Sequence, residues 1–150
     1  MKGPHGLKTP SRMRDIANSK MAYAEGVPLD WKCGALAEGL ACYGRAEFFL
    51  AHEHWESVWL TLDEPEKSFL QALIQMTAAF HHLKAGNPAG AFSLLQRALR
   101  RLELCPPCFG GIAITRLRAD ICEWLQAIEK GTTSIPAAFP RICPVDQPPE

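Results

Sequence analysis

The chain has 150 residues, which is enough for one domain that buries a hydrophobic core without metal ions or disulfides to hold it together. Its 16 basic and 16 acidic side chains cancel, so the net charge gives no general attraction to nucleic acid or to an anionic membrane. The most apolar stretch, residues 69–80, is too short to span a bilayer, and the basic N-terminus lacks the apolar core of a signal peptide. We therefore expect a soluble, cytoplasmic protein without a nucleic-acid or membrane partner.

Prolines divide the chain into three parts. Residues 1–29 contain prolines at positions 4, 10 and 28 and are predicted to form an N-terminal arm that is only partly ordered. Residues 30–131 have the apolar spacing of helices and are predicted to form a helical domain. Residues 132–150, with prolines at 136, 140, 144, 148 and 149, cannot form a regular helix and are predicted to be an extended strap or a disordered tail.

Caps and helix breakers predict where the first three helices begin and end. Asp30 is the expected cap of a helix that runs to Gly44, and a second helix follows over about residues 45–60. The stretch LDEPE at 62–66 fits a capping box, with Asp63 as the cap and Glu66 returning the hydrogen bond. It opens a third helix that ends near residue 85.

Two more helices complete the predicted domain. Asn87 and Pro88 start the fourth, which runs to about residue 104. Thr115 is the expected cap of the fifth, which ends at Gly131. No strand pattern or internal repeat is present in the sequence. The predicted fold class is all-α: a single-domain array of about five helices, with a central antiparallel hairpin formed by the second and third.

The six cysteines are expected to be free thiols in a reducing compartment rather than a disulfide framework. Only Cys105 and Cys108, in the stretch CPPC, have a spacing with chemical meaning, and one such pair supplies half of a zinc site. The stretch FGG follows the pair, which does not fit the strand-to-helix setting of a thioredoxin-like redox motif. CPPC is therefore predicted to be a plain turn between two helices.

The stretch AHEHWESVW at 51–59 places histidines, glutamates and tryptophans close together on the second predicted helix. His52 and Glu56 are four residues apart, so their side chains share one face and are close enough to hydrogen-bond or to hold one divalent ion. Trp59 lies one turn further along that face, and Glu53 flanks it. The spacing differs from the His-Glu-x-x-His helix of zinc proteases, because no second histidine follows where that motif requires one.

The apolar neighbours of these residues predict which side of the helix is buried. Phe49 and Leu60 lie on the face of His52 and Glu56, so that face is predicted to point into the protein. His54 and Ser57 lie roughly opposite and are predicted to be exposed.

The hairpin register predicts which residues of the third helix meet this face. With the turn near residue 62, facing positions have numbers that add to about 125. Gln71 and Gln75 then lie within reach of His52 and Glu56. His82 lies about 12 Å further along the helix axis, which is too far to complete a metal site.

These motifs, in this order, resemble the bacterial and archaeal family named domain of unknown function 309. Its signature, His-x-x-x-Glu-x-x-Trp or Tyr, falls on His52, Glu56 and Trp59, and the resemblance covers roughly residues 32–128. The resemblance implies a helical protein whose signature has been suspected of binding metal. Relatives commonly carry Glu where this chain has Leu50, and Asp where it has Ala113, so a site built from those two carboxylates is depleted here.

Three hypotheses of function follow. In the first, the helical domain binds a divalent metal ion or a small polar ligand through His52 and Glu56; the supporting residues are Glu53, Trp59, Gln71 and Gln75. In the second, His52 and Glu56 form only a buried hydrogen-bond network, and the protein is a structural or interaction module that binds a second copy of itself or another protein. In the third, Glu56 is the general acid or base of a hydrolase-type enzyme. Neither the identity of the metal nor the presence of enzyme activity is predicted.

Overall fold

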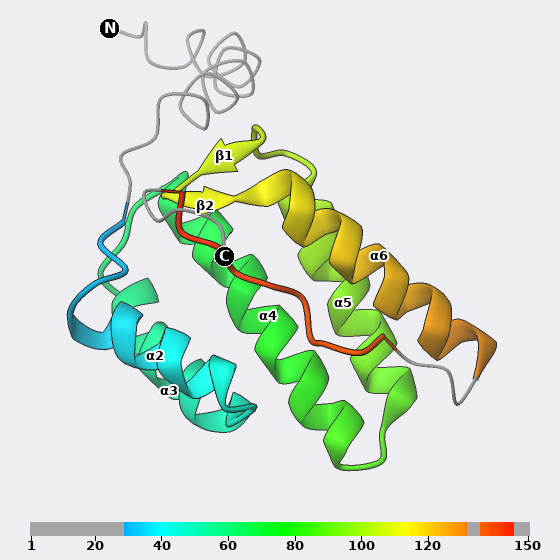
Figure 1. The fold of residues 1–150 in the computed structure, drawn as a ribbon. Helices are drawn as coiled ribbons and strands as arrows, with labels where there is room; N and C mark the ends of the chain where they lie inside the picture. The colour runs from blue at the N-terminus through cyan, green and yellow to red at the C-terminus, as the bar shows by residue number, and fades with distance from the viewer. Residues whose placement is uncertain (1–28, 132–135, 146–150) are drawn as a thin grey trace, which may run out of the picture.

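A computed structural model describes residues 29–131 and 136–145, and the predictions for residues 1–28, 132–135 and 146–150 lie outside that part of the chain. Five helices and a two-stranded hairpin make up the described fold (Figure 1). In chain order they are α2 (Gly34–Gly44), α3 (Phe48–Trp59), α4 (Glu66–Lys84), α5 (Pro88–Leu102), β1 (Cys108–Phe109), β2 (Ile112–Ala113) and α6 (Ile114–Lys130). The predicted all-α class is confirmed.

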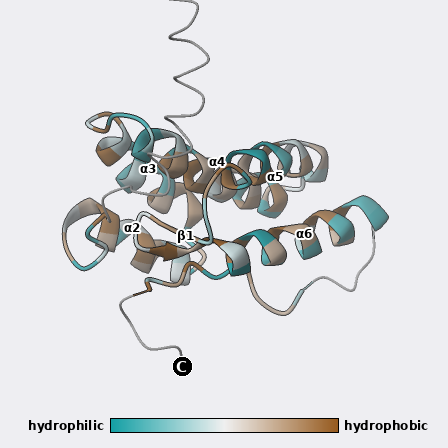
Figure 2. Ribbon diagram, turned by 90° about the horizontal axis from the view of Figure 1, so that it is seen from above, coloured by the Kyte–Doolittle hydropathy of each residue, from teal (hydrophilic) through white to brown (hydrophobic). Residues whose placement is uncertain are grey.

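The helices form two layers, which Figure 2 shows edge-on in a view from above. One layer contains α3, α4 and α5 side by side, and the other contains α2, the hairpin and α6. Helix α4 is the middle helix of its layer, and it contributes several of the largest fully buried side chains, among them Phe69, Leu73, Met76 and Phe80. The hydrophobic core therefore lies around α4, as its continuous apolar sequence requires.

Helices α3 and α4 form the predicted antiparallel hairpin. Near the turn, the Lys67 ammonium lies over the Trp59 ring, 4.4 Å from its centroid. At the other end, the rings of Phe48 and Phe80 lie 5.5 Å apart. Such pairs have numbers that add to 126 near the turn and 128 further along, against the expected 125. The residue facing His52 therefore shifts by about two positions, from Leu73 to about Gln75.

Two predicted helix starts are wrong, because of local backbone geometry that side-chain patterns do not reveal. Helix α2 begins at Gly34 and not after Asp30, whose carboxylate accepts the backbone N–H of Lys32 in a turn before the helix. Gly34 itself has a φ of 70°, which interrupts any helix entering from Asp30. Helix α3 begins at Phe48 and not at Arg45, because Ala46 has a φ of 61° in the turn between the two helices.

The predicted caps at Asp63 and Thr115 are also wrong. Helix α4 begins one residue after Pro65 without a side-chain cap, and the Glu64 carboxylate instead accepts the backbone N–H of Ser68. Helix α6 follows Ala113, and its first backbone N–H donates to the carbonyl oxygen of Pro107 at 2.7 Å. The turn before α6 thus supplies the acceptor that a capping side chain would otherwise provide.

Two other helix ends are confirmed. The Asn87 side chain accepts the backbone N–H of Gly90 at 3.1 Å, so Asn87 is the cap of α5, with Pro88 as its first residue. At the end of α6, Gly131 takes the left-handed conformation, with a φ of 62°. Helix α5 ends at Leu102, slightly before the expected residue 104, and Arg118 donates to the Leu102 carbonyl oxygen there.

The region after α5 contains a short hairpin that the sequence analysis did not predict. Strands β1 and β2 pair antiparallel through Gly110 and Gly111, which have φ values of 60° and 80°. CPPC therefore leads from α5 into the hairpin rather than forming a plain turn between helices. The six cysteines are free thiols, as expected.

Residues 136–145 form an extended strap, which is one of the two forms predicted for the proline-rich tail, and the strap runs back from the end of α6 to the hairpin (Figure 1). At its end, the backbone N–H of Ala113 donates to the Cys143 carbonyl oxygen. Near its middle, the Tyr43 hydroxyl donates to the Pro140 carbonyl oxygen at 2.6 Å. These hydrogen bonds fasten the strap to α2 and to the hairpin, which belong to the same layer. None of the described helices is long and apolar enough to cross a membrane.

Candidate metal and ligand site on α3 and α4

The core-facing side of α3 differs from the one predicted. Phe48, Ala51 and Trp55 are buried, and the Trp55 indole N–H donates to the Leu36 carbonyl oxygen of α2. Phe49 is 55% exposed and Leu60 is 68% exposed, so the prediction that their face points inward is wrong. The helical period places the buried residues on an adjacent stripe, which leaves His52 at the edge of the core rather than inside it.

His52, Glu53 and Glu56 form a cluster of three potential metal ligands. Each offers one ligand atom, and these atoms all lie within 4.8 Å of one another. His52 is half-buried, whereas both glutamates are exposed. The prediction of a buried Glu56 is therefore wrong, and its carboxylate remains in contact with solvent.

Three buried polar atoms of α3 and α4 have no hydrogen-bond partner in the described residues, and one of them belongs to His52 of the cluster. They are His52 Nδ1 and Trp59 Nε1 on α3 and Gln75 Oε1 on α4. A buried donor or acceptor without a partner costs about 1–3 kcal/mol, and most such atoms in proteins are satisfied. Two of these atoms belong to His52 and Gln75, which were predicted to share a buried hydrogen-bond network with Glu56, so the described residues do not show that network.

A groove of about 540 Å³ lies beside the cluster and crosses three helices. From α3 it is lined by His52, Glu56 and Trp59. The remaining lining residues come from the α3–α4 turn, α4 and α5: Glu64, Lys67, Ser68, Gln71, Ile74 and Arg101. Gln71 thus lines the same groove as His52 and Glu56, whereas Gln75 is not among the lining residues. The groove gives a bound ion or ligand access to solvent.

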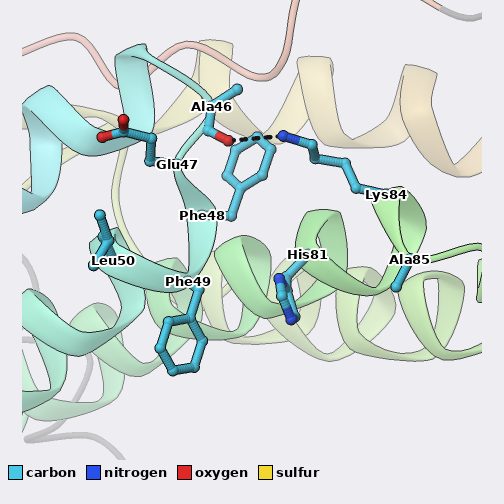
Figure 3. A pocket seen from close by; sticks show the side chains of 8 residues that line it. All are labelled: Ala46, Glu47, Phe48, Phe49, Leu50, His81, Lys84 and Ala85. Carbon is cyan, nitrogen blue, oxygen red and sulfur yellow. Dashed lines mark hydrogen bonds between the residues drawn. The ribbon is translucent and has the colours of Figure 1, made fainter.

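His54, His81 and His82, the other histidines of the described residues, do not take part in this cluster. The Phe49 ring centroid lies 6.4 Å from that of His52 and 5.7 Å from that of His81. Figure 3 shows the Phe49 and His81 side chains next to each other in a second, more apolar groove. His82 lies beside Asn87, with 3.2 Å between the side-chain nitrogens. His54 is 34% exposed and lies 3.6 Å from Glu38 of α2.

Lys67, Ser68 and Arg101 line the groove but were not predicted as site residues. The sequence does contain a signal for Lys67, because the hairpin register places it close to Trp59. Arg101 belongs to α5, more than 40 positions after Glu56, and no short-range spacing connects the two. Only the packing of α5 against α4 brings Arg101 to the groove, where it donates to the Ser68 hydroxyl at 3.5 Å.

The sequence model of the family described as a domain of unknown function, DUF309, matches residues 36–94. The resemblance to DUF309 is confirmed over that segment. The DUF309 segment contains the His52, Glu56 and Trp59 signature and extends from α2 into α5, but it ends before Arg101. An uncharacterized protein of Aquifex aeolicus (strain VF5) is 34% identical over 97 residues, which are 64% of this chain and 29% of that protein. The chain therefore spans less than a third of the length of this curated relative.

The two departures from the DUF309 pattern have different structural settings. Leu50 is 48% exposed on α3, close to the metal-ligand cluster in sequence but outside the groove. Ala113 is the cap position of α6, where a carboxylate would serve the helix N-terminus. Position 113 lies at the N-terminus of α6 and not in the cluster on α3, so Ala113 takes no ligand away from that cluster.

Proposed function

We propose that this protein binds a divalent metal ion through His52, Glu53 and Glu56. The observation that carries the proposal is that one ligand atom from each of these three residues lies within 4.8 Å of the others. In addition, His52 has a buried ring nitrogen, Nδ1, without a hydrogen-bond partner. One imidazole and two carboxylates suit ions such as Zn²⁺, Ni²⁺, Fe²⁺ or Mn²⁺. Three protein ligands also leave a coordination position open, as in catalytic rather than structural zinc sites.

The exposure of the two glutamates supports this proposal. Zinc–ligand bonds of about 2.0–2.2 Å place neighbouring ligands of a tetrahedral ion about 3.4 Å apart, so the cluster must close slightly around an ion. Glu53 and Glu56 are exposed and can rotate without disturbing the core, whereas His52 is half-buried and its ring stacks beside Phe49. The glutamates are therefore the ligands with more freedom to adjust to an ion.

Isothermal titration calorimetry with metal ions tests the proposal. Ni²⁺ and Mn²⁺ are the suitable probes, because the six free cysteines would compete for the thiol-preferring Zn²⁺. We expect one ion per chain, and His52→Ala or Glu56→Gln should weaken binding at least about 10-fold, the smallest loss typical even of residues that only support a ligand.

His54→Ala is the matched control, because His54 lies on the same helix and outside the cluster. It should leave the affinity unchanged. Wild-type protein that binds neither ion contradicts the proposal, and so does a His54→Ala variant that loses as much affinity as His52→Ala.

A protein-interaction role is the second candidate, because large apolar side chains are exposed along α3. Phe49 and Leu60 are more than half exposed, and Leu50 is 48% exposed. Exposed apolar surface of this kind is typical of contacts with another protein or with a second copy of the chain. Light scattering after size-exclusion chromatography tests this role: a concentration-dependent dimer that Leu60→Ser abolishes would support it, and a strict monomer would count against self-association.

A further inference from the structure

Arg101 is a charged residue of the groove beside the cluster that is half-buried and has few partners. Its side chain is half-buried and makes one long hydrogen bond, 3.5 Å to the Ser68 hydroxyl. Among residues 29–131 and 136–145, no carboxylate pairs with it. A guanidinium has five N–H donors in a planar fork, so most of the donors of Arg101 stay available on the wall of the groove.

Other donors line the groove around Arg101. Lys67 holds its ammonium over the Trp59 ring, which fixes the position of the charge without neutralising it. The Ser68 hydroxyl and the Gln71 amide also line the groove, on the same face of α4. Two cations, a hydroxyl and an amide are the groups that proteins use to hold phosphate and carboxylate oxygens.

The groove also contains two carboxylates, which contact different groups. The Glu64 carboxylate keeps its negative charge and accepts the Ser68 backbone N–H at 3.1 Å. Glu56 belongs to the metal-ligand cluster, where a divalent ion would neutralise it. Metal binding would therefore leave two cations, Lys67 and Arg101, and one carboxylate, Glu64, so that positive charge is in excess in the groove.

We infer that the groove binds a small molecule carrying an oxyanion, a phosphate or carboxylate group, held by Arg101 and Lys67 with Ser68 and Gln71 in support. This inference rests on the proposed metal site, because the bound ion removes the repulsion from Glu56 and strengthens oxyanion binding. The two sites are distinct, since the metal ligands come from α3 and the oxyanion-binding residues come from α4 and α5.

Calorimetric titrations with inorganic phosphate and with succinate test the inference and separate the two sources of the oxyanion. Protein saturated with Ni²⁺ should bind at least one of the two probes, and the tighter one identifies the group. Arg101→Gln should weaken binding about 10- to 100-fold, the range for a charge-assisted hydrogen bond. Arg100→Gln is the matched control, because Arg100 is the exposed neighbour on α5 and lies outside the groove.

The same variants separate failure of the oxyanion site from failure of the metal site. Arg101→Gln should keep wild-type affinity for Ni²⁺, and His52→Ala without metal should still bind the anion, but more weakly than the Ni²⁺-loaded wild type. Equal anion affinities of wild type and Arg101→Gln, or an equal loss in Arg100→Gln, would overturn the oxyanion site whatever the metal titration gives. A metal-free protein that binds phosphate and succinate as tightly as the Ni²⁺-loaded one would overturn the coupling.

Discussion

Cys105 and Cys108 are three residues apart, but they have different surroundings. Cys105 is buried, and its thiol donates to the Arg101 carbonyl oxygen, with 3.8 Å between sulfur and oxygen. Burial raises the pKa of the Cys105 thiol to about 12, against a smaller opposing effect of Arg118. Cys108 is exposed at the start of β1. The two thiols of CPPC therefore do not act as a matched redox or zinc-binding pair in this conformation.

Alkylation rates at pH 8 should reveal this difference. Iodoacetamide reacts with thiolate, and a pKa of about 12 leaves only about one Cys105 in ten thousand ionised at pH 8. We expect Cys105 to stay unmodified in the native protein while Cys108 and Cys122, which are exposed, react. Peptide mapping by mass spectrometry measures each site. Equal rates at Cys105 and Cys108 would contradict the described packing.

Cys33 provides an internal control for the electrostatic part of this argument. It is exposed, but its thiol donates to the Asp30 carboxylate at 3.1 Å, which raises the pKa of Cys33. It should therefore react more slowly than Cys122 despite being accessible. Asp30→Asn removes the negative charge and should accelerate Cys33 alone.

At the scale of secondary-structure elements, α2 and α3 pack so closely at Gly39 that this position has no space for a side chain. A Cβ added at Gly39 would lie within 2.8 Å of three atoms of the Trp55 indole. The indole cannot easily move, because it is fully buried, donates to the Leu36 carbonyl oxygen and stacks on Tyr43 at 6.2 Å. The close approach of the two helices depends on this glycine.

Gly39→Ala should accordingly destabilise the protein by about 1–3 kcal/mol, the usual cost of overfilling a packed core. Gly44→Ala is the matched control on the same helix, since a Cβ there meets nothing within 4 Å. It should leave stability unchanged or raise it by up to about 1 kcal/mol, as alanine restricts the unfolded chain. Urea denaturation followed by circular dichroism measures both variants, and similar midpoints would contradict the close α2–α3 contact.

The helices could be predicted from the sequence, but several of their ends could not. Apolar spacing extends over many residues, so it identified each helix and the antiparallel α3–α4 pair. The starts of α2 and α3 depend on single backbone torsions, at Gly34 and Ala46, which no side-chain pattern encodes. The start of α4 was also not predictable from side-chain patterns, because the carboxylate of Glu64, and not that of Asp63, accepts a backbone N–H of the first turn.

The candidate site was predicted only in part, because helical spacing can be read from the sequence and the packing of helices cannot. His52 and Glu56 are neighbours through helical spacing alone, so their pairing on one face followed from the sequence. Their exposure did not, because Phe49 and Leu60 are apolar residues that remain outside the core. Arg101 comes to the groove only through the packing of three helices, and a register error of about two residues is enough to change which α4 residue faces His52.

At the scale of the whole molecule, the strap joins the two layers through an aromatic cluster. The Phe139 ring stacks on Trp124 of α6 at 5.2 Å with an interplanar angle of 6°. It also meets the edges of Phe48 and Phe80, both at 4.9 Å between centroids. One strap residue thus contacts α3, α4 and α6, which are spread over both layers.

Polar contacts on either side of Phe139 hold the strap in this place. The Trp124 indole donates to the Ala138 carbonyl oxygen at 3.0 Å, and the Tyr43 hydroxyl donates to the next residue but one, Pro140. Burial, with a smaller contribution from Asp120, raises the pKa of Tyr43 well above its ordinary value, so its hydroxyl stays a donor at any physiological pH. Without the strap, these buried donors would lose their acceptors.

Phe139→Ala should therefore destabilise the whole fold and not only the strap. We expect a loss of about 2–3 kcal/mol, below the full cost of a core phenylalanine because Phe139 is only partly buried. Phe49→Ala is the matched control: the same atoms are removed, but from a side chain that is 55% exposed, so its cost should stay below about 1 kcal/mol. Both losses are measured by urea denaturation. If the two variants unfold at the same urea concentration, the strap is not part of the cooperative unit, because removing its anchor would then matter no more than trimming the surface.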